Sequence, residues 1–236
     1  MKTFLAILIL ILSNNRLSGQ ILSIKGIEND LHETYQKILY NRFGDKLSND
    51  SIENYNHLFR EKLIKYTSKY PQTFTHKFDI LRKKDNIDIV NSEDSLLRIY
   101  SWNTWLGGTM YDFHNVFQYK SGTKIYSKVY YDTSDFANGN YIPFYSQIFL
   151  LRSKDITYYL LIYNGIYSSS DVSQSIKVVT IENNSINDSV KLIKTKEGLV
   201  NSISFEFDFF SVVDRPERPL KLIKYDNEKR LFIYLL

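Results

Sequence analysis

An aspartate and a histidine, Asp112 and His114, stand two residues apart near the middle of the chain. On a β-strand, residues at this spacing point to the same face of the sheet. A carboxylate beside an imidazole can bind a metal or exchange protons, but the neighbouring sequence supplies no third ligand. The alternative is a hydrogen-bonded or solvated histidine. We therefore assign no metal ligand and no catalytic residue, and treat both side chains as candidates for a binding site.

The same segment holds both tryptophans of the chain, and its only Gly-Gly pair begins two residues after the second. Glycine tolerates positive φ and lets the backbone approach a partner closely, while exposed aromatic rings stack on sugars and anchor protein interfaces. We therefore predict a loop that binds a protein or glycan ligand. The alternative is a tryptophan-rich strand that enters the core before a glycine turn. The candidate ligand-binding residues are Trp102, Trp105, Gly107, Gly108, Tyr111, Asp112 and His114.

Motifs for catalysis are missing from the rest of the chain. There is no cysteine, no Gly-x-Ser-x-Gly elbow, no phosphate-binding loop and no His-Glu-x-x-His zinc motif. Glu206 and Asp208 share a face, as paired glycosidase carboxylates do, but their alternation with apolar residues is explained by a half-exposed strand. We expect no cofactor. The leading hypothesis is a non-enzymatic binding or envelope-associated protein, and the alternative is an extracellular hydrolase acting on a polymer.

The first 19 residues have the pattern of a cleavable signal peptide. A start containing Lys2 precedes an unbroken apolar run of nine residues, 4–12, and a polar stretch ends in small residues at Gly19. A helix of that length spans about 14 Å, less than half of the roughly 30 Å hydrocarbon core, so a membrane anchor is the weaker alternative. We predict export to the periplasm or the medium.

Composition limits what the mature chain, residues 20–236, can be. Without cysteine it forms no disulfide and offers no thiol for a lipid anchor. Removing residues 1–19 lowers the net charge from +4 to +2, and acids and bases are interspersed. This balance argues against nucleic acid as a partner. No later apolar stretch is long enough to span a membrane, so we expect no integral span after cleavage.

Two amphipathic helices are predicted within residues 26–70, where apolar residues recur at spacings of three and four. Gly44 is predicted to end the first helix in a left-handed conformation. Asp50 and Glu53 are predicted to form a capping box for the second, and Pro71 blocks its continuation. The short connection favours an antiparallel helical hairpin.

Residues 87–236 are predicted to be β-rich, because short segments of Ile, Val, Tyr and Phe alternate with turn residues. Connections this short do not make parallel crossovers, so the sheet is predicted to be an antiparallel meander. Residues 202–209 alternate strictly and predict one core face and one solvated face. Residues 157–163 are apolar on both faces and predict a central strand covered by the helices. The apolar residues 231–236 predict a last strand paired into the sheet.

The predicted fold class is therefore α+β, in a single domain covering residues 20–236. An N-terminal α-helical hairpin is followed by a largely antiparallel, meandering β-sheet or sandwich. The segments PQTFTHKFDIL, at residues 71–81, and LRIYSWNTWLGGTMYDFHNVFQYK, at 97–120, resemble a stretch in uncharacterised exported proteins of Gram-negative bacteria. The resemblance implies export and bacterial origin, and it implies no activity and no catalytic residue.

Overall fold

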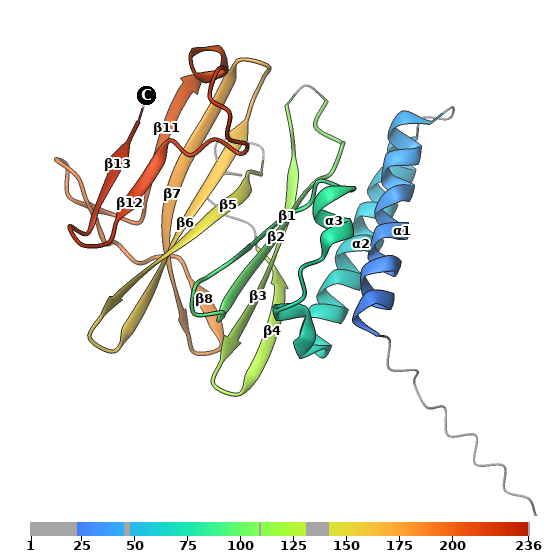
Figure 1. Ribbon diagram of the computed structural model, residues 1–236, viewed down its shortest axis with the longest axis horizontal. Helices are drawn as coiled ribbons and strands as arrows, with labels where there is room; N and C mark the ends of the chain where they lie inside the picture. The colour runs from blue at the N-terminus through green and yellow to red at the C-terminus, as the bar shows by residue number, and fades with distance from the viewer. Residues whose placement is uncertain (1–22, 45–47, 109, 131–141, 236) are drawn as a thin grey trace, which may run out of the picture.

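The computed structural model describes residues 23–44, 48–108, 110–130 and 142–235. The predicted signal peptide, residues 1–19, therefore lies outside the described residues. The elements form four layers (Figure 1): the N-terminal helices, a first β-sheet, a second β-sheet and a C-terminal β-hairpin. The prediction of an α+β fold with an N-terminal helical pair followed by antiparallel sheet is confirmed.

The helical elements are α1 (Ile24–Phe43), α2 (Asn49–Lys69), the 3-10 turn η1 (Pro71–Phe74), α3 (Asp79–Lys83) and the 3-10 turn η2 (Phe209–Val212). The strands are β1 (Asp88–Asn91), β2 (Leu97–Asn103), β3 (Phe113–Ser121), β4 (Lys124–Val129), β5 (Phe144–Ser153), β6 (Ile156–Ile166), β7 (Asp171–Glu182), β8 (Ser185–Asn187), β9 (Ile193–Lys194), β10 (Leu199–Val200), β11 (Ser202–Asp208), β12 (Ile223–Asp226) and β13 (Leu231–Tyr234).

The strands form two main antiparallel sheets. The inner sheet has the order β1-β2-β3-β4 and lies against the helices. The outer sheet has the order β11-β7-β6-β5, with β8 paired to β7. Strands β12 and β13 pair only with each other among the described residues, and we call this pair the C-terminal hairpin. The prediction that the last strand pairs into the sheet is therefore wrong, because its backbone bonds go to β12.

The helix ends differ from the predicted caps. Gly44 is extended, with φ of −80°, and not left-handed. Glycine is needed there for space, since a Cβ would collide with the carbonyl oxygen of Tyr40. Helix α2 is capped by Ser48, whose hydroxyl accepts the N–H of Ser51 at 3.3 Å, so the predicted cap at Asp50 is two residues too late. Its end before Pro71 is confirmed.

Strand β2 is the centre of the first two interfaces because it is buried on both faces. Tyr100 and Trp102 pack against the helices, and Leu97 and Ile99 pack against the outer sheet. The predicted apolar stripes of the helices are buried against it: Ile27, Leu31, Tyr35, Ile38, Ile52, Phe59, Leu63 and Tyr66. The layers are therefore held together by apolar burial on both sides of the inner sheet.

Strand β6 is central in the outer sheet, but the helices do not cover it. Tyr159 and Leu161 pack toward the inner sheet, whereas Leu160 and Ile162 pack toward the C-terminal hairpin around Ile223. The prediction of helical cover is wrong because the inner sheet already occupies the position between β6 and the helices (Figure 1).

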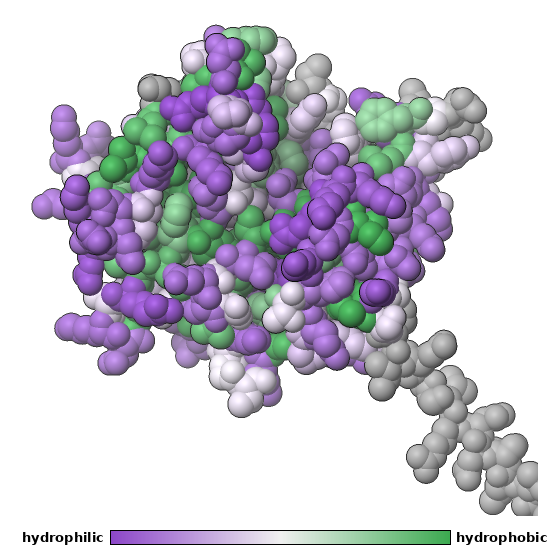
Figure 2. All heavy atoms as spheres, in the orientation of Figure 1, coloured by the Kyte–Doolittle hydropathy of each residue, from purple (hydrophilic) through white to green (hydrophobic). Residues whose placement is uncertain are grey.

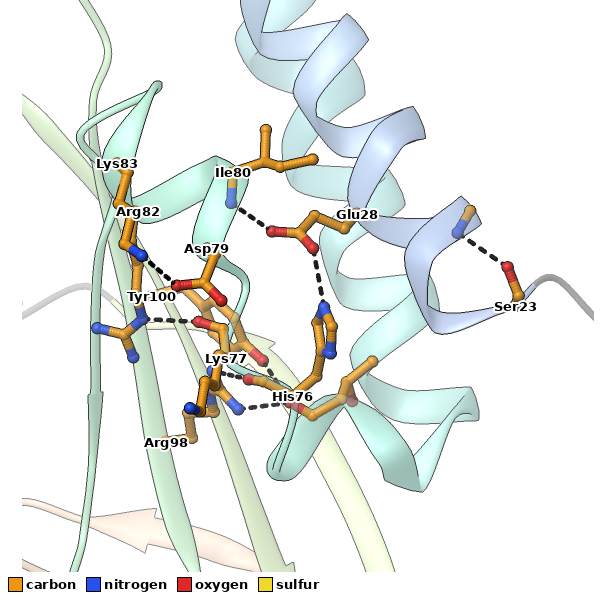
Figure 3. Close-up of polar contacts among 12 residues, drawn as sticks. Ser23, Glu28, His76, Lys77, Asp79, Ile80, Arg82, Lys83, Arg98 and Tyr100 are labelled. Carbon is orange, nitrogen blue, oxygen red and sulfur yellow. Dashed lines mark hydrogen bonds and ion pairs between the residues drawn. The ribbon is translucent and has the colours of Figure 1, made fainter.

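A buried arginine fixes the segment between α2 and α3 against β2. Arg98 is only 1% exposed and has no carboxylate partner among the described residues. Its guanidinium donates to the carbonyl oxygens of Thr73, Phe74 and His76, each at 2.7 Å. Figure 3 shows its contact with His76. The guanidinium also lies 5.2 Å from the ring centroid of Phe78. Burial without a counter-ion is tolerated here because carbonyl dipoles and a ring face replace water.

Two histidine–carboxylate pairs connect α1 to the same region. Glu28 is buried, accepts the backbone N–H of Ile80 at 2.7 Å and contacts Nε2 of His76 at 2.8 Å (Figure 3). Asp85, also buried, contacts Nδ1 of His32 at 2.9 Å, and burial raises the pKa of the Asp85 carboxyl. Both carboxylates have hydrogen-bond partners within the protein, so we infer that the two pairs stabilise the packing of α1 against α3 and the residues around it.

Arg98→Met is predicted to lower the free energy of unfolding by about 3–5 kcal/mol, because three carbonyl oxygens lose their short hydrogen bonds from the guanidinium. The measurement is urea denaturation at neutral pH. Arg152→Met is the matched control, since Arg152 is an exposed arginine on β5, and its effect is expected within about 0.5 kcal/mol. Equal effects of the two substitutions would contradict the role assigned to Arg98.

Candidate functional site

A pocket of about 790 Å³ lies between the loop after β2, the strands of the outer sheet and the segment before β12. Figure 2 shows apolar residues exposed among charged ones on this β-rich side of the molecule. The pocket is lined by Gly108, Tyr111, Phe144, Asn164, Gly165, Ile166, Ser168, Ser169, Val172, Ser173, Phe207, Phe209, Arg218, Pro219 and Leu220. Two of the predicted site residues, Gly108 and Tyr111, line this pocket. The rest of the wall includes residues of β5, β6, β7 and β11, which come later in the sequence.

Most polar side chains of this wall form hydrogen bonds within the protein. Three of them are paired as follows: Asn164 with Gln174 at 2.8 Å, Ser168 with Asp171 at 2.7 Å, and Ser173 with Tyr167 at 3.0 Å. Four aromatic rings remain as the main exposed surface, those of Tyr111, Phe144, Phe207 and Phe209. The pocket therefore presents an apolar surface, with most of its hydrogen-bonding capacity already satisfied.

Arg218 is the cationic side chain of this wall, and its guanidinium is held by the backbone. It donates to the carbonyl oxygens of Arg215 at 2.6 Å, Glu217 at 2.7 Å and Val213 at 3.1 Å. Its carbon Cζ lies 5.3 Å from the ring centroid of Phe209. The arginine therefore orders the segment after η2 and supports the aromatic wall.

Trp102 is not available to a ligand in this structure. Its side chain is 0% exposed, and its indole N–H donates to Oδ1 of Asn56 at 3.0 Å. Asn56 in turn donates to the carbonyl of Thr104 at 2.8 Å, which connects α2 to the start of the loop. The ring packs edge-on against Phe59 and His114. Trp102 therefore lies in the core, as in the alternative of a tryptophan-rich strand that enters it.

Trp105 lies in the loop after β2, where it is half-buried and has φ of +63°. Its backbone N–H donates to Oδ1 of Asn103 at 2.8 Å, an arrangement that favours the left-handed conformation. Its indole N–H donates to the hydroxyl of Tyr35 at 3.1 Å. The ring lies between Phe43 and Tyr111, at centroid distances of 4.9 and 6.3 Å. Trp105 thus supports Tyr111 from behind and does not line the pocket.

The Gly-Gly pair forms the turn that brings the loop to the pocket. A Cβ on Gly107 would overlap the carbonyl oxygen of Met110, so only glycine fits there. Gly108 has φ of +66° and open space around its Cα. The backbone N–H of Tyr111 then donates to the carbonyl of Ile166 at 3.0 Å, which ties the loop to the end of β6. The ring of Tyr111 is 39% exposed and lines the pocket.

Asp112 is a half-buried residue that holds the loop closed. Its Oδ1 accepts the backbone N–H of Ile142 at 3.2 Å, and its Oδ2 accepts the hydroxyl of Thr104 at 3.3 Å. Burial raises the pKa of this carboxyl above its usual range, against the effect of the two hydrogen bonds. The two carboxylate oxygens therefore link Thr104 to Ile142 through hydrogen bonds.

His114 is half-buried beside Trp102, its direct partner across β2 and β3. Burial lowers the pKa of the imidazole to about 4, and the positive charge of Arg60 adds to this effect. His114 is therefore neutral at physiological pH. Within the described ranges, no group of three or more His, Cys, Asp or Glu side chains is arranged to hold a metal ion.

Most of the pocket wall was not predicted from the sequence. The alternation of residues 202–209 predicts a core face for Phe207 and Phe209, but both are only half-buried and line the opening. Phe144, Asn164 and Leu220 come from distant segments and carry no motif. The available signal is the apolar stripe of residues 203–209, which follows the edge strand β11 into η2.

Comparison with known proteins gives no assignment. No protein-family model matches the chain, and neither a curated protein nor a solved structure shows significant similarity to it. Of the helices that the structure describes, none combines the length and the apolar character needed to cross a membrane.

Titration of His114 is predicted to weaken the fold in mild acid. The unfolded histidine binds a proton near pH 6.5, whereas the folded one does so only near pH 4, so stability falls as pH drops through this window. The loss between pH 7.5 and pH 5 is expected to reach about 2 kcal/mol. The check is urea denaturation of the wild type and His114→Gln at both pH values.

The comparison isolates His114 because other groups titrate equally in the two proteins. Asp88, for example, has a pKa raised by burial to about 6 and contributes a slope of the opposite sign. His114→Gln should lose less stability than the wild type on going to pH 5. Identical losses in both proteins would contradict the assignment.

Proposed function

We propose that this chain is an exported, non-enzymatic binding protein whose pocket receives a small apolar molecule. The observation that carries the proposal is a concave wall with four aromatic rings and a volume of about 790 Å³. Ligand pockets have volumes of roughly 300–1,000 Å³ and are mainly apolar. The signal-like residues 1–19 support export.

The wall favours an apolar ligand over the glycan considered from the sequence. A sugar carries hydroxyl groups on every side, and each one that is buried without a partner costs free energy. Asn164, Ser168 and Ser173 already have partners within the protein. An aliphatic or aromatic group, by contrast, gains from burial against Phe207 and Phe209 without needing new donors.

The hydrolase alternative gains no support from the geometry of Asp112 and His114. The carboxylate oxygens of Asp112 accept hydrogen bonds from Ile142 and Thr104. The ring of His114 packs against the fully buried Trp102. A catalytic pair would need to reach a substrate, and these two side chains contact the interior of the fold.

The test uses N-phenyl-1-naphthylamine, an uncharged apolar fluorophore whose emission rises in an apolar site. The wild type is expected to bind it, and Phe209→Ala is expected to weaken binding about tenfold through loss of buried ring contact. Phe210→Ala is the matched control, because Phe210 is the next residue, is 61% exposed and does not line the pocket. Absence of binding, or equal losses in both variants, would overturn the proposal.

A further inference from the structure

A second pocket, of about 390 Å³, lies between the outer sheet and the C-terminal hairpin. It shares no lining residue with the first pocket. Its walls are Leu151, Leu160, Ile176, Leu192, Ile193, Lys194, Ile203, Phe205, Ile223, Tyr225, Arg230, Leu231, Phe232 and Tyr234. Apolar residues dominate this wall, but it also includes two tyrosines and two cationic residues.

Two hydroxyl groups in this wall have no hydrogen-bond partner. The phenol oxygens of Tyr225 and Tyr234 are buried and make no hydrogen bond with any described group. Both residues lie on the same face of the hairpin, because Tyr225 pairs with Phe232 and Tyr234 follows two positions later. Buried hydroxyls nearly always have a partner, so two unpaired donors in one wall indicate a ligand that accepts hydrogen bonds.

The same wall carries two positively charged side chains. Lys194, at the end of β9, and Arg230, in the turn before β13, are exposed residues of the same pocket. Among the described residues, neither has an ion-pair partner. Burial raises the pKa of the Tyr225 phenol, whereas the charge of Arg230 lowers this pKa and that of Asp226 raises it.

We infer that this second pocket binds a small apolar carboxylic acid. The apolar body lies against Ile176, Ile203 and Phe205, which are the outward-facing residues of β7 and β11. The carboxylate accepts the hydroxyl of Tyr225 and is neutralised by Arg230 and Lys194. This ligand uses the groups that a purely apolar molecule leaves unused, the Tyr225 hydroxyl and the two cations.

The charge of the wall selects this class over its neutral and cationic analogues. An alkyl alcohol offers an acceptor for the phenol but gains nothing from the two cations. An alkylamine offers an apolar body of the same length but is repelled by them. The inference does not depend on the proposed occupant of the first pocket, since the two walls are separate.

The test is isothermal titration calorimetry of the whole mature chain with decanoate, decanol and decylamine below their aggregation concentrations. Decanoate is expected to bind at least tenfold more tightly than decanol, and decylamine is expected not to bind. The preference for decanoate should weaken as salt is raised, because the cations are exposed. Equal affinities for decanoate and decanol, or no binding of decanoate, would overturn the inference.

Substitutions locate the binding site. Tyr225→Phe and Arg230→Gln are each expected to weaken decanoate binding about tenfold, and Lys229→Gln, which changes an exposed lysine outside the wall, is the matched control. Phe209→Ala should leave decanoate binding unchanged, because it alters only the first pocket. If Phe209→Ala weakens decanoate binding while Tyr225→Phe and Arg230→Gln do not, the acid binds in the first pocket and the inference is wrong.

Discussion

The hydrogen bonds of one buried glutamine hold the C-terminal segment on the outer sheet. Gln174, at the centre of β7, is 0% exposed. Its Nε2 donates to Oδ1 of Asn164 at 2.8 Å and to the carbonyl of Leu220 at 2.7 Å, and its Oε1 accepts the N–H of Ile223 at 2.7 Å. Leu220 lines the first pocket and Ile223 lines the second. Both candidate sites therefore depend on the same side chain.

The chain has no cysteine, so no disulfide fastens its long connections. Buried polar side chains take this role at two places. Arg98 binds the carbonyl oxygens of the connector after α2, and Gln174 binds the backbone of the segment before β12. In each case removing the side chain would take hydrogen bonds away from buried backbone groups, which makes the attachment specific as well as stabilising.

Local sequence patterns predict the helices, the antiparallel strands and their order along the chain. The spacing of apolar residues within a short window is enough to distinguish a helix from a strand. The sites do not follow from such patterns. Trp102 carries the strongest sequence signal and lies in the core, since β2 is covered on both faces. Phe207 looks like a core residue and lines a pocket, since β11 lies at a sheet edge. Which face of a strand is covered is decided by residues far away in the sequence, and only the assembled layers show it.

The most direct test of this account is hydrogen–deuterium exchange of Gln174→Met, which keeps the side-chain volume and removes its hydrogen bonds. We predict faster exchange across residues 220–234, including the amide of Ile223, whose bond to Oε1 is lost. Exchange in the paired strands β6 and β7 should remain slow, because their backbone ladder is intact. Unchanged exchange across residues 220–234 would contradict the claim that Gln174 holds the segment that completes both pockets.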